Sequence, residues 1–215
     1  MPGSVAVTVA ATLAATVTAT VTAAATVTVA VTVAGVAGCG APEEEIPTYF
    51  PAPSFRLTDQ SARVFSSDAL RGKVWIASFF FTSCRTVCPL TTSKMGNVRR
   101  RLAAHGDDVW FVSLSVDPEH DTPAALGVYA RRMHADVPNW RFLTGSRADL
   151  TRAITGGFKQ VMQDDPGDGS NTDLLHGTRL ALVDRRGSVR GFYDTDAAGL
   201  AKLVSFAERL LAEAP

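Results

Sequence analysis

The first 42 residues contain no Asp, Glu, Lys or Arg, although the whole chain of 215 residues carries 21 basic and 21 acidic side chains. The formal net charge is therefore zero, which argues against a broad surface for nucleic acid or for anionic membranes. Cysteine is also scarce: of the three present, Cys84 and Cys88 are close neighbours and Cys39 is distant. An odd number of cysteines predicts that one of them has a separate role. The length fits one domain with an extension.

The uncharged N-terminal segment consists almost entirely of Ala, Val and Thr between residues 4 and 38. Such a run fits a secretory signal that is removed, a retained membrane anchor or a low-complexity tail. The sequence VAGC at Val36–Cys39 resembles the lipobox of bacterial lipoproteins, which implies cleavage before Cys39 and a lipid on that residue. We therefore expect residues 1–38 to be a lipoprotein signal or membrane anchor, and residues 39–52 to be a Pro-rich tether.

Both the signal and the anchor would export the soluble part of the chain. We expect it to lie on the extracytoplasmic face of the bacterial cell membrane, held there through the lipid or the N-terminal anchor. A lipid on one cysteine gives modest membrane affinity, so a second contact or more than one acyl chain is expected. Residues 53–215 have the composition of a single folded domain.

The folded part alternates predicted strands with predicted helices. Two continuous apolar runs, 74–81 and 109–116, have the length and the β-branched and aromatic content of strands buried on both faces. The other expected elements are a β-hairpin within 53–73, a helix at 89–104, a helix capped by Thr122 with Pro123 in its first turn, a short strand or loop at 140–145, a helix at 146–157, a hairpin at 178–194 and a closing helix at 196–214. This order predicts an α/β sandwich with a mixed sheet.

The two neighbouring cysteines lie where a buried strand gives way to a helix. Cys84 follows the run 74–81, and Cys88 is at the start of the helix, beside Pro89. Open α/β sheets place their sites at the carboxyl ends of strands, and a helix N-terminus favours the thiolate, which both attacks disulfides and binds metals. Four residues of helix rise about 6 Å, near the upper end of the Cα separation that a disulfide tolerates. The pair is therefore a redox disulfide, a two-thiolate metal clamp or two structural thiols.

A metal site with two sulfur ligands needs a further partner, and the chain offers four histidines. His105 is at a predicted helix end, and His134 is in a charged helical stretch. His120 lies in the loop DPEHDTP after the second apolar run, and His176 ends a long polar loop just before a strand. Considered singly, each position is more typical of a structural or surface histidine than of a ligand.

Five segments, taken together and in order, make the chain from about Pro53 to Tyr193 resemble the Sco/SenC copper proteins. They are FxLTDQ at 55–60, LRGKVWIASFFFTSCRTVCP at 70–89, VSLSVDPEHDTPAAL at 112–126, WRFLTG at 140–145 and LLHGTRLALVDRRGSVRGFY at 174–193. The resemblance implies a thioredoxin-like fold for residues 53–215: a central mixed sheet flanked by helices, with an N-terminal β-hairpin. It also implies that the chain binds one copper ion.

By the same resemblance, the copper ligands would be the thiolates of Cys84 and Cys88 and the imidazole of His176. Soft thiolates with imidazole favour Cu(I), while Cu(II) stays open as an alternative. Asp117 and Asp121, in the loop after the second apolar run, are expected to cap and orient rather than to bind the metal.

The function implied is that of a metallochaperone in cytochrome c oxidase assembly, which delivers copper to the dinuclear copper centre of subunit II. The alternative is an extracytoplasmic thiol-disulfide oxidoreductase, in which Cys84 and Cys88 are a redox pair that reduces the cysteines of that centre. Whether the chain is also an enzyme therefore stays open. A peroxidase of the same fold would need an arginine against a peroxidatic thiolate, for which Arg85 is the nearby candidate. The expected partners are subunit II or a similar copper acceptor and the membrane, with no nucleic acid.

Overall fold

The computed structural model describes residues 44–160 and 179–213. Three features expected from the sequence lie outside these residues: the signal or anchor at 1–38, Cys39, and the part of the polar loop that contains His176. Within the described residues, no helix combines the length and the apolar character needed to cross a bilayer.

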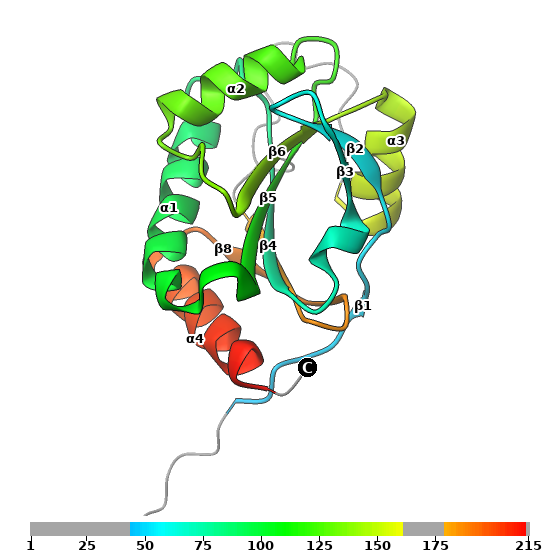
Figure 1. Ribbon diagram of the computed structural model, residues 1–215. Helices are drawn as coiled ribbons and strands as arrows, with labels where there is room; N and C mark the ends of the chain where they lie inside the picture. The colour runs from blue at the N-terminus through cyan, green and yellow to red at the C-terminus, as the bar shows by residue number, and fades with distance from the viewer. Residues whose placement is uncertain (1–43, 161–178, 214–215) are drawn as a thin grey trace, which may run out of the picture. The chain divides into compact units, whose positions relative to one another are not determined.

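The described residues form one mixed sheet with the strand order β1-β8-β7-β4-β5-β6-β2-β3 (Figure 1). The strands are β1 (Phe50–Pro51), β2 (Arg56–Asp59), β3 (Val64–Ser66), β4 (Val74–Phe80), β5 (Val109–Ser115), β6 (Trp140–Thr144), β7 (Arg179–Val183) and β8 (Ser188–Asp194). Strands β4, β5 and β6 are parallel, whereas β7 runs antiparallel to β4 on its other side. The expected hairpins are β2–β3 and β7–β8, and the first of them extends the sheet by pairing with β6.

Helices cover both faces of the sheet. They are α1 (Val87–Arg101), α2 (Pro123–Arg132), α3 (Arg147–Thr151) and α4 (Ala197–Ala212), with 3-10 turns η1 (Ser67–Leu70) and η2 (Ala103–Asp108) and a π-helical turn η3 (Arg152–Gly157). Figure 1 shows α1, α2 and α4 on one side of the sheet and α3 on the other. This arrangement confirms the predicted central mixed sheet flanked by helices.

Strand β4 is buried along its whole length because it has packing partners on both faces. Ile76 and Phe80 point into the core shared with α1, α2 and α4, while Trp75 and Phe79 point into the core shared with α3. A strand with two buried faces has no polar side to alternate with its apolar one, which explains the continuous apolar run. The carboxyl end of β4, where the cysteines follow, is thereby held on both sides.

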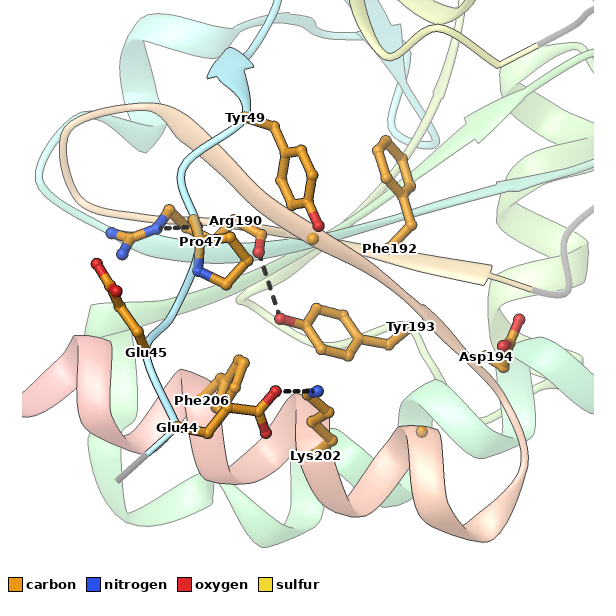
Figure 2. A pocket seen from close by; sticks show the side chains of 12 residues that line it. Glu44, Glu45, Pro47, Tyr49, Arg190, Phe192, Tyr193, Asp194, Lys202 and Phe206 are labelled. Carbon is orange, nitrogen blue, oxygen red and sulfur yellow. Dashed lines mark hydrogen bonds and ion pairs between the residues drawn. The ribbon is translucent and has the colours of Figure 1, made fainter. Parts of the chain in front are cut away.

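Residues 44–52, the second half of the expected tether, lie on the folded domain. The Arg190 guanidinium donates a hydrogen bond to the Pro47 carbonyl at 2.7 Å (Figure 2) and another to the Ile46 carbonyl at 2.8 Å. Ile46 is only 7% exposed, and Phe50 pairs with Val189 in the β1–β8 ladder. The folded domain therefore begins before Pro53, because this Pro-rich stretch makes its hydrogen bonds with a distant strand rather than locally.

A pocket of about 550 Å³ lies between residues 44–49, β8 and α4. Figure 2 shows its aromatic side chains Tyr49, Phe192, Tyr193 and Phe206. Glu44 closes one side through an ion pair with Lys202, and the Tyr193 hydroxyl donates to the Arg190 carbonyl at 3.4 Å. Neither Cys84 nor Cys88 lines this pocket, so we interpret it as the seam between the N-terminal segment and the domain.

Candidate functional site

Cys84 and Cys88 lie together in the loop and first helical turn that follow β4. Both are free thiols, and both are buried: Cys84 is 9% exposed and Cys88 is fully buried. The backbone N–H of Cys88 donates a hydrogen bond to the sulfur of Cys84 at 3.4 Å. The structure thus places the two predicted thiols side by side at the carboxyl end of a parallel strand, where α/β sheets carry their sites.

The start of α1 explains this contact. Thr86 is the residue before the helix, yet its side chain makes no capping hydrogen bond, and the first turn contains no carboxylate. The first amides of a helix have no partner within the helix, so they need an outside acceptor. Cys84 supplies one, because its sulfur accepts from the second residue of the helix as a capping oxygen normally would. Pro89 costs nothing in this turn, since its missing N–H would have had no helical acceptor.

The two thiols have opposite pKa shifts. Burial alone raises the pKa of Cys84, but hydrogen bonds from the backbone amides of Cys88 and Thr86 outweigh it, and the net pKa is lowered. For Cys88, burial raises the pKa strongly, and the nearby charges of Cys84 and Asp121 raise it further. When the reduced pair carries one negative charge, that charge therefore resides on Cys84.

Asp121 holds the cysteine loop in place from the neighbouring strand. Its carboxylate is fully buried and accepts from the Thr82 backbone N–H at 3.0 Å, the Thr82 hydroxyl at 2.5 Å and the Ser115 hydroxyl at 2.5 Å. Burial raises the pKa of Asp121, and these hydrogen bonds oppose the shift. The carboxylate joins the end of β4, the end of β5 and the start of α2, which is the orienting role expected of it.

The sequence analysis did not single out Thr82 and Ser115, which complete this arrangement. Their signal in the sequence is a hydroxyl residue at the end of each apolar run, where an aliphatic residue would continue the core. Ser115 also accepts from the backbone N–H of Asp117 at 3.0 Å. Hydroxyl groups can satisfy a buried carboxylate without adding charge, which makes them suitable partners here.

Tyr129 and Thr92 are a second pair that the sequence analysis missed. The Tyr129 hydroxyl lies 2.9 Å from the Thr92 hydroxyl and so ties α2 to α1. The Tyr129 ring packs on Phe80 with the ring centroids 5.1 Å apart, just before the cysteine loop. Burial raises the pKa of Tyr129 to about 12, so the phenol is neutral at physiological pH. The polar pair Thr91–Thr92 on a buried helical face was the available signal.

The described histidines lie apart from the cysteine pair. His120 is largely exposed, and its Nδ1 contacts the Asp117 carboxylate at 2.9 Å, which raises the pKa of His120. His134 is exposed and follows α2 with a positive φ of 53°. His105 lies in η2, beyond the far end of α1. Within the described residues, no hydrogen bond or ion pair joins these histidines to Cys84 or Cys88.

Among residues 44–160 and 179–213, no group of three His, Cys, Asp or Glu side chains could hold a metal ion. The expected third ligand, His176, lies outside these residues. Strand β7 begins at Arg179 and runs antiparallel to β4, with Ala181 opposite Ala77. The first residue of β7 therefore lies near the carboxyl end of β4, the end that the cysteines follow.

The two sulfur atoms can perform two kinds of chemistry. A thiolate paired with a second thiol in a buried, partly apolar site suits a soft ion such as Cu(I). The same pair, with one thiol activated and the other protonated, suits disulfide exchange. The described donors fit both, and the pair alone does not distinguish them.

The SCO1/SenC family model matches residues 44–210. Among solved structures, a SCO1/SenC family lipoprotein from Bacillus anthracis is 32% identical with a TM-score of 0.66, over 75% of this chain and 95% of that one. BsSco, described as a member of the Sco family of cytochrome c oxidase assembly proteins with a disulfide switch, is 28% identical with a TM-score of 0.68, over 80% and 99% of the two chains.

ScoI from Bradyrhizobium japonicum, whose structure holds copper, is 24% identical with a TM-score of 0.62, over 74% of this chain and 99% of that one. At that identity, the likeness concerns the fold alone. Together, these structures confirm the thioredoxin-like fold class that the sequence resemblance implied.

Proposed function

The chain belongs to the SCO1/SenC family, and we propose that it is a metallochaperone that carries copper to the dinuclear copper centre of cytochrome c oxidase subunit II. The observation that carries the proposal is the pair of adjacent buried thiols Cys84 and Cys88, in which a backbone amide donates to the sulfur of Cys84. Thiolate ligands favour Cu(I) over harder ions. Copper is the cargo, and one ion per chain is expected.

His176 is the third ligand in this proposal. It precedes Arg179, the first residue of β7, by three positions. Three extended residues span roughly 10 Å, and β7 begins at the same edge of the sheet as the cysteine loop. That reach supports His176 as a ligand, because an imidazole complements two thiolates for Cu(I) while leaving room for an incoming ligand.

The residues around the pair have separate parts in loading. Cys84 offers its thiolate first, because its pKa is lowered, whereas Cys88 must lose a proton as it binds. Asp121 and Thr82 keep the loop in the geometry that brings the two sulfurs together. Copper uptake is therefore expected to release protons and to strengthen as the pH rises.

Titration of the reduced full-length chain with Cu(I) tests the proposal. We expect one ion per chain, and loss of high-affinity binding in Cys84→Ser, Cys88→Ser and His176→Ala. His134→Ala is the matched control, because His134 is exposed and follows α2, with no hydrogen bond to either cysteine. Binding of copper by His176→Ala as tight as in the wild type would remove His176 from the site.

A thiol-disulfide oxidoreductase is the second candidate, favoured by the opposite pKa shifts of the two cysteines. The Cys84 thiolate would attack a disulfide of the target and displace one of its thiols. Cys88 would then lose its proton and attack the mixed disulfide, giving a Cys84–Cys88 disulfide and a fully reduced target. His176→Ala separates the two functions: a reductase keeps its rate of disulfide reduction in this variant, whereas a metallochaperone loses its copper.

We further propose that Cys39 carries a lipid that anchors the chain at the extracytoplasmic face of the cell membrane. The support is the lipobox-like VAGC sequence together with the likeness to the B. anthracis lipoprotein. Intact-mass analysis should find a chain that begins at Cys39 with added acyl mass. A mature chain that retains residues upstream of Cys39 and has no lipid mass would contradict this.

A further inference from the structure

Two large apolar side chains are exposed beside the buried cysteine pair. Val87 is 38% exposed and Leu90 is 54% exposed, while Cys88 between them is fully buried. Residues three apart in a helix share a face, so Val87 and Leu90 form one apolar spot on the first turn of α1. The other exposed large apolar residues of the described chain, Tyr49, Val64 and Val128, lie on other elements.

The same end of α1 carries a positive charge. Between Ser83 and Ser93 the chain contains Arg85 but no Asp or Glu. Arg85 and Thr86 are exposed, and the N-terminus of α1 adds the partial positive charge of the helix dipole.

The carboxylates of the adjoining loop do not offset this charge. Asp121 is buried, the Asp117 carboxylate contacts His120, and Glu119 pairs with Arg147. Among the described residues, the surface beside the cysteines therefore combines an apolar spot with the positive charge of Arg85.

When a metal passes between two proteins by ligand exchange, a sulfur of the acceptor binds the ion while a sulfur of the donor still holds it. Because metal–sulfur bonds are only about 2.3 Å long, the two proteins must be in close contact at that point. Cys84 is buried, whereas Arg85 and Val87, which follow it closely in the chain, are exposed. An acceptor that reaches Cys84 from this side must therefore cover them.

We propose that Arg85, Val87 and Leu90 form the docking face for the copper acceptor, whose own cysteine ligands would be surrounded by an apolar patch and carboxylates. This inference rests on the proposed function and names the surface through which it operates. Val87 and Leu90 become buried at the centre of the contact, where apolar burial contributes to affinity. Arg85 steers the encounter at the rim, where charge acts mainly on the association rate.

The test uses the full-length chain in detergent and, as probe, the soluble domain of cytochrome c oxidase subunit II with its cysteines reduced. Two quantities are measured: the Kd of the copper-free pair by calorimetry, and the rate of Cu(I) transfer at limiting acceptor. We expect Leu90→Asn to raise the Kd about five- to tenfold. Arg85→Glu should slow transfer several-fold at low ionic strength, with the difference shrinking as salt screens the charge.

Two matched controls lie elsewhere on the domain. Val64→Asn changes an apolar residue of similar exposure, 61%, on the edge strand β3. Arg186→Glu reverses an exposed charge in the turn between β7 and β8, at the opposite edge of the sheet from the cysteines. Both should leave the Kd and the transfer rate unchanged, and all four variants should still bind one Cu(I).

The outcomes separate this inference from the proposed function. If the wild type loads and transfers copper and Leu90→Asn and Arg85→Glu do so equally well, the docking face is wrong and the chaperone function stands. If either variant fails to bind copper, its residue belongs to the metal site and the docking role is overturned. If the wild type neither binds Cu(I) nor transfers it, the proposed function fails and the inference fails with it.

Discussion

Cys84 and Cys88 are four residues apart in the sequence, yet backbone amides stabilise a thiolate on Cys84, while burial opposes one on Cys88. The difference arises because the sulfur of Cys84, in the loop, accepts from an amide of the helix start, whereas Cys88, inside the first turn, is fully buried. Two chemically identical side chains thus acquire different reactivities from their positions on either side of a helix N-terminus.

Alkylation kinetics should reveal this difference. With iodoacetamide and the reduced chain, the rate of modification of Cys84 should reach half its maximum below pH 9.0, the ordinary pKa for a thiol, because the pKa of Cys84 is lowered. Cys88 should stay unmodified across the same range, because its pKa is raised. Peptide mass spectrometry distinguishes the two, and a sample unfolded in urea, where both should react alike, is the control. Faster modification of Cys88 in the folded chain would contradict the assignment.

Asp121 should link stability to pH. Because its pKa is raised on folding, the folded state holds the proton more tightly than the unfolded state does. Ionisation of Asp121 therefore lowers the free energy of unfolding. This loss is absent below the unfolded pKa, grows as the pH rises to the folded pKa, and persists above it. Asp121→Asn should remove this dependence while keeping acceptor and donor positions for Thr82 and Ser115. Urea unfolding of both proteins between pH 3 and 8, a range chosen to span the ordinary and raised values of an Asp pKa, measures it.

Asp121→Ala is the companion variant, because it removes the acceptor as well as the charge. The Thr82 amide and the Ser115 hydroxyl would then be buried without a partner. Each such group costs about 1–3 kcal/mol, so the variant should be less stable than Asp121→Asn at every pH. Equal stability of the two variants would mean that these hydrogen bonds contribute little.

At the scale of elements, the sequence predicted a helix end correctly where an ordinary capping residue marks it. The sequence predicted a helix at 89–104, but α1 begins at Val87 and ends at Arg101, and a separate 3-10 turn follows. The cap at Thr122, in contrast, is confirmed, because its hydroxyl accepts from the Ala125 amide within the same turn. A capping hydroxyl such as that of Thr122 is visible in the sequence, whereas the acceptor at the start of α1 is the sulfur of Cys84, a residue type that does not usually cap a helix.

The third helix continues past α3 as a π-helical turn that ends at two glycines. A Cβ atom on Gly157 would lie 2.2 Å from the Cβ of Pro53, whereas one on Gly156 would meet nothing closer than 4.0 Å. Gly157 is therefore needed for close packing of this turn against the start of the hairpin segment, and its role in ending the helix is only part of its function.

Gly157→Ala should consequently destabilise the domain by about 1–3 kcal/mol, the usual cost of overpacking a tight contact. Gly156→Ala is the matched control and should be neutral or slightly stabilising, because alanine reduces the freedom of the unfolded chain. The free energies of unfolding from urea titrations compare them. Equal effects of the two substitutions would show that Pro53 moves aside freely.

At the scale of the whole molecule, the folded domain includes a segment whose composition is typical of a tether. Residues 44–52 are Pro-rich, yet they add an edge strand to β8 and occupy the guanidinium of Arg190, which also pairs with the buried Asp184. Residues 44–52 are thus part of the folded domain.

Truncation tests this dependence. A chain that begins at Glu44 should unfold at the same temperature as one that begins at Cys39, whereas a chain that begins at Pro53 should melt about 5–10 °C lower. The reasons are the lost burial of Ile46, about 2 kcal/mol for a side chain of this size, and the loss of acceptors for Arg190. About 2–4 °C per kcal/mol is typical of a domain of this length. Equal melting temperatures for all three chains would show that the segment only rests on the surface.

Local patterns were enough to predict the strands other than β1, most helices, the two hairpins and the position of the cysteine pair between strand and helix. These features depend on hydrophobic periodicity, turn residues and capping within a few positions of one another, so the amino-acid sequence by itself determines them.

The tertiary structure alone decided how completely Cys88 is buried, how Asp121 reaches Thr82 across 39 residues, and how Arg190 reaches Pro47 across 143. Such contacts are set by which strands become neighbours and which groups lose water. Those outcomes depend on the packing of the whole domain, and no short stretch of sequence encodes them.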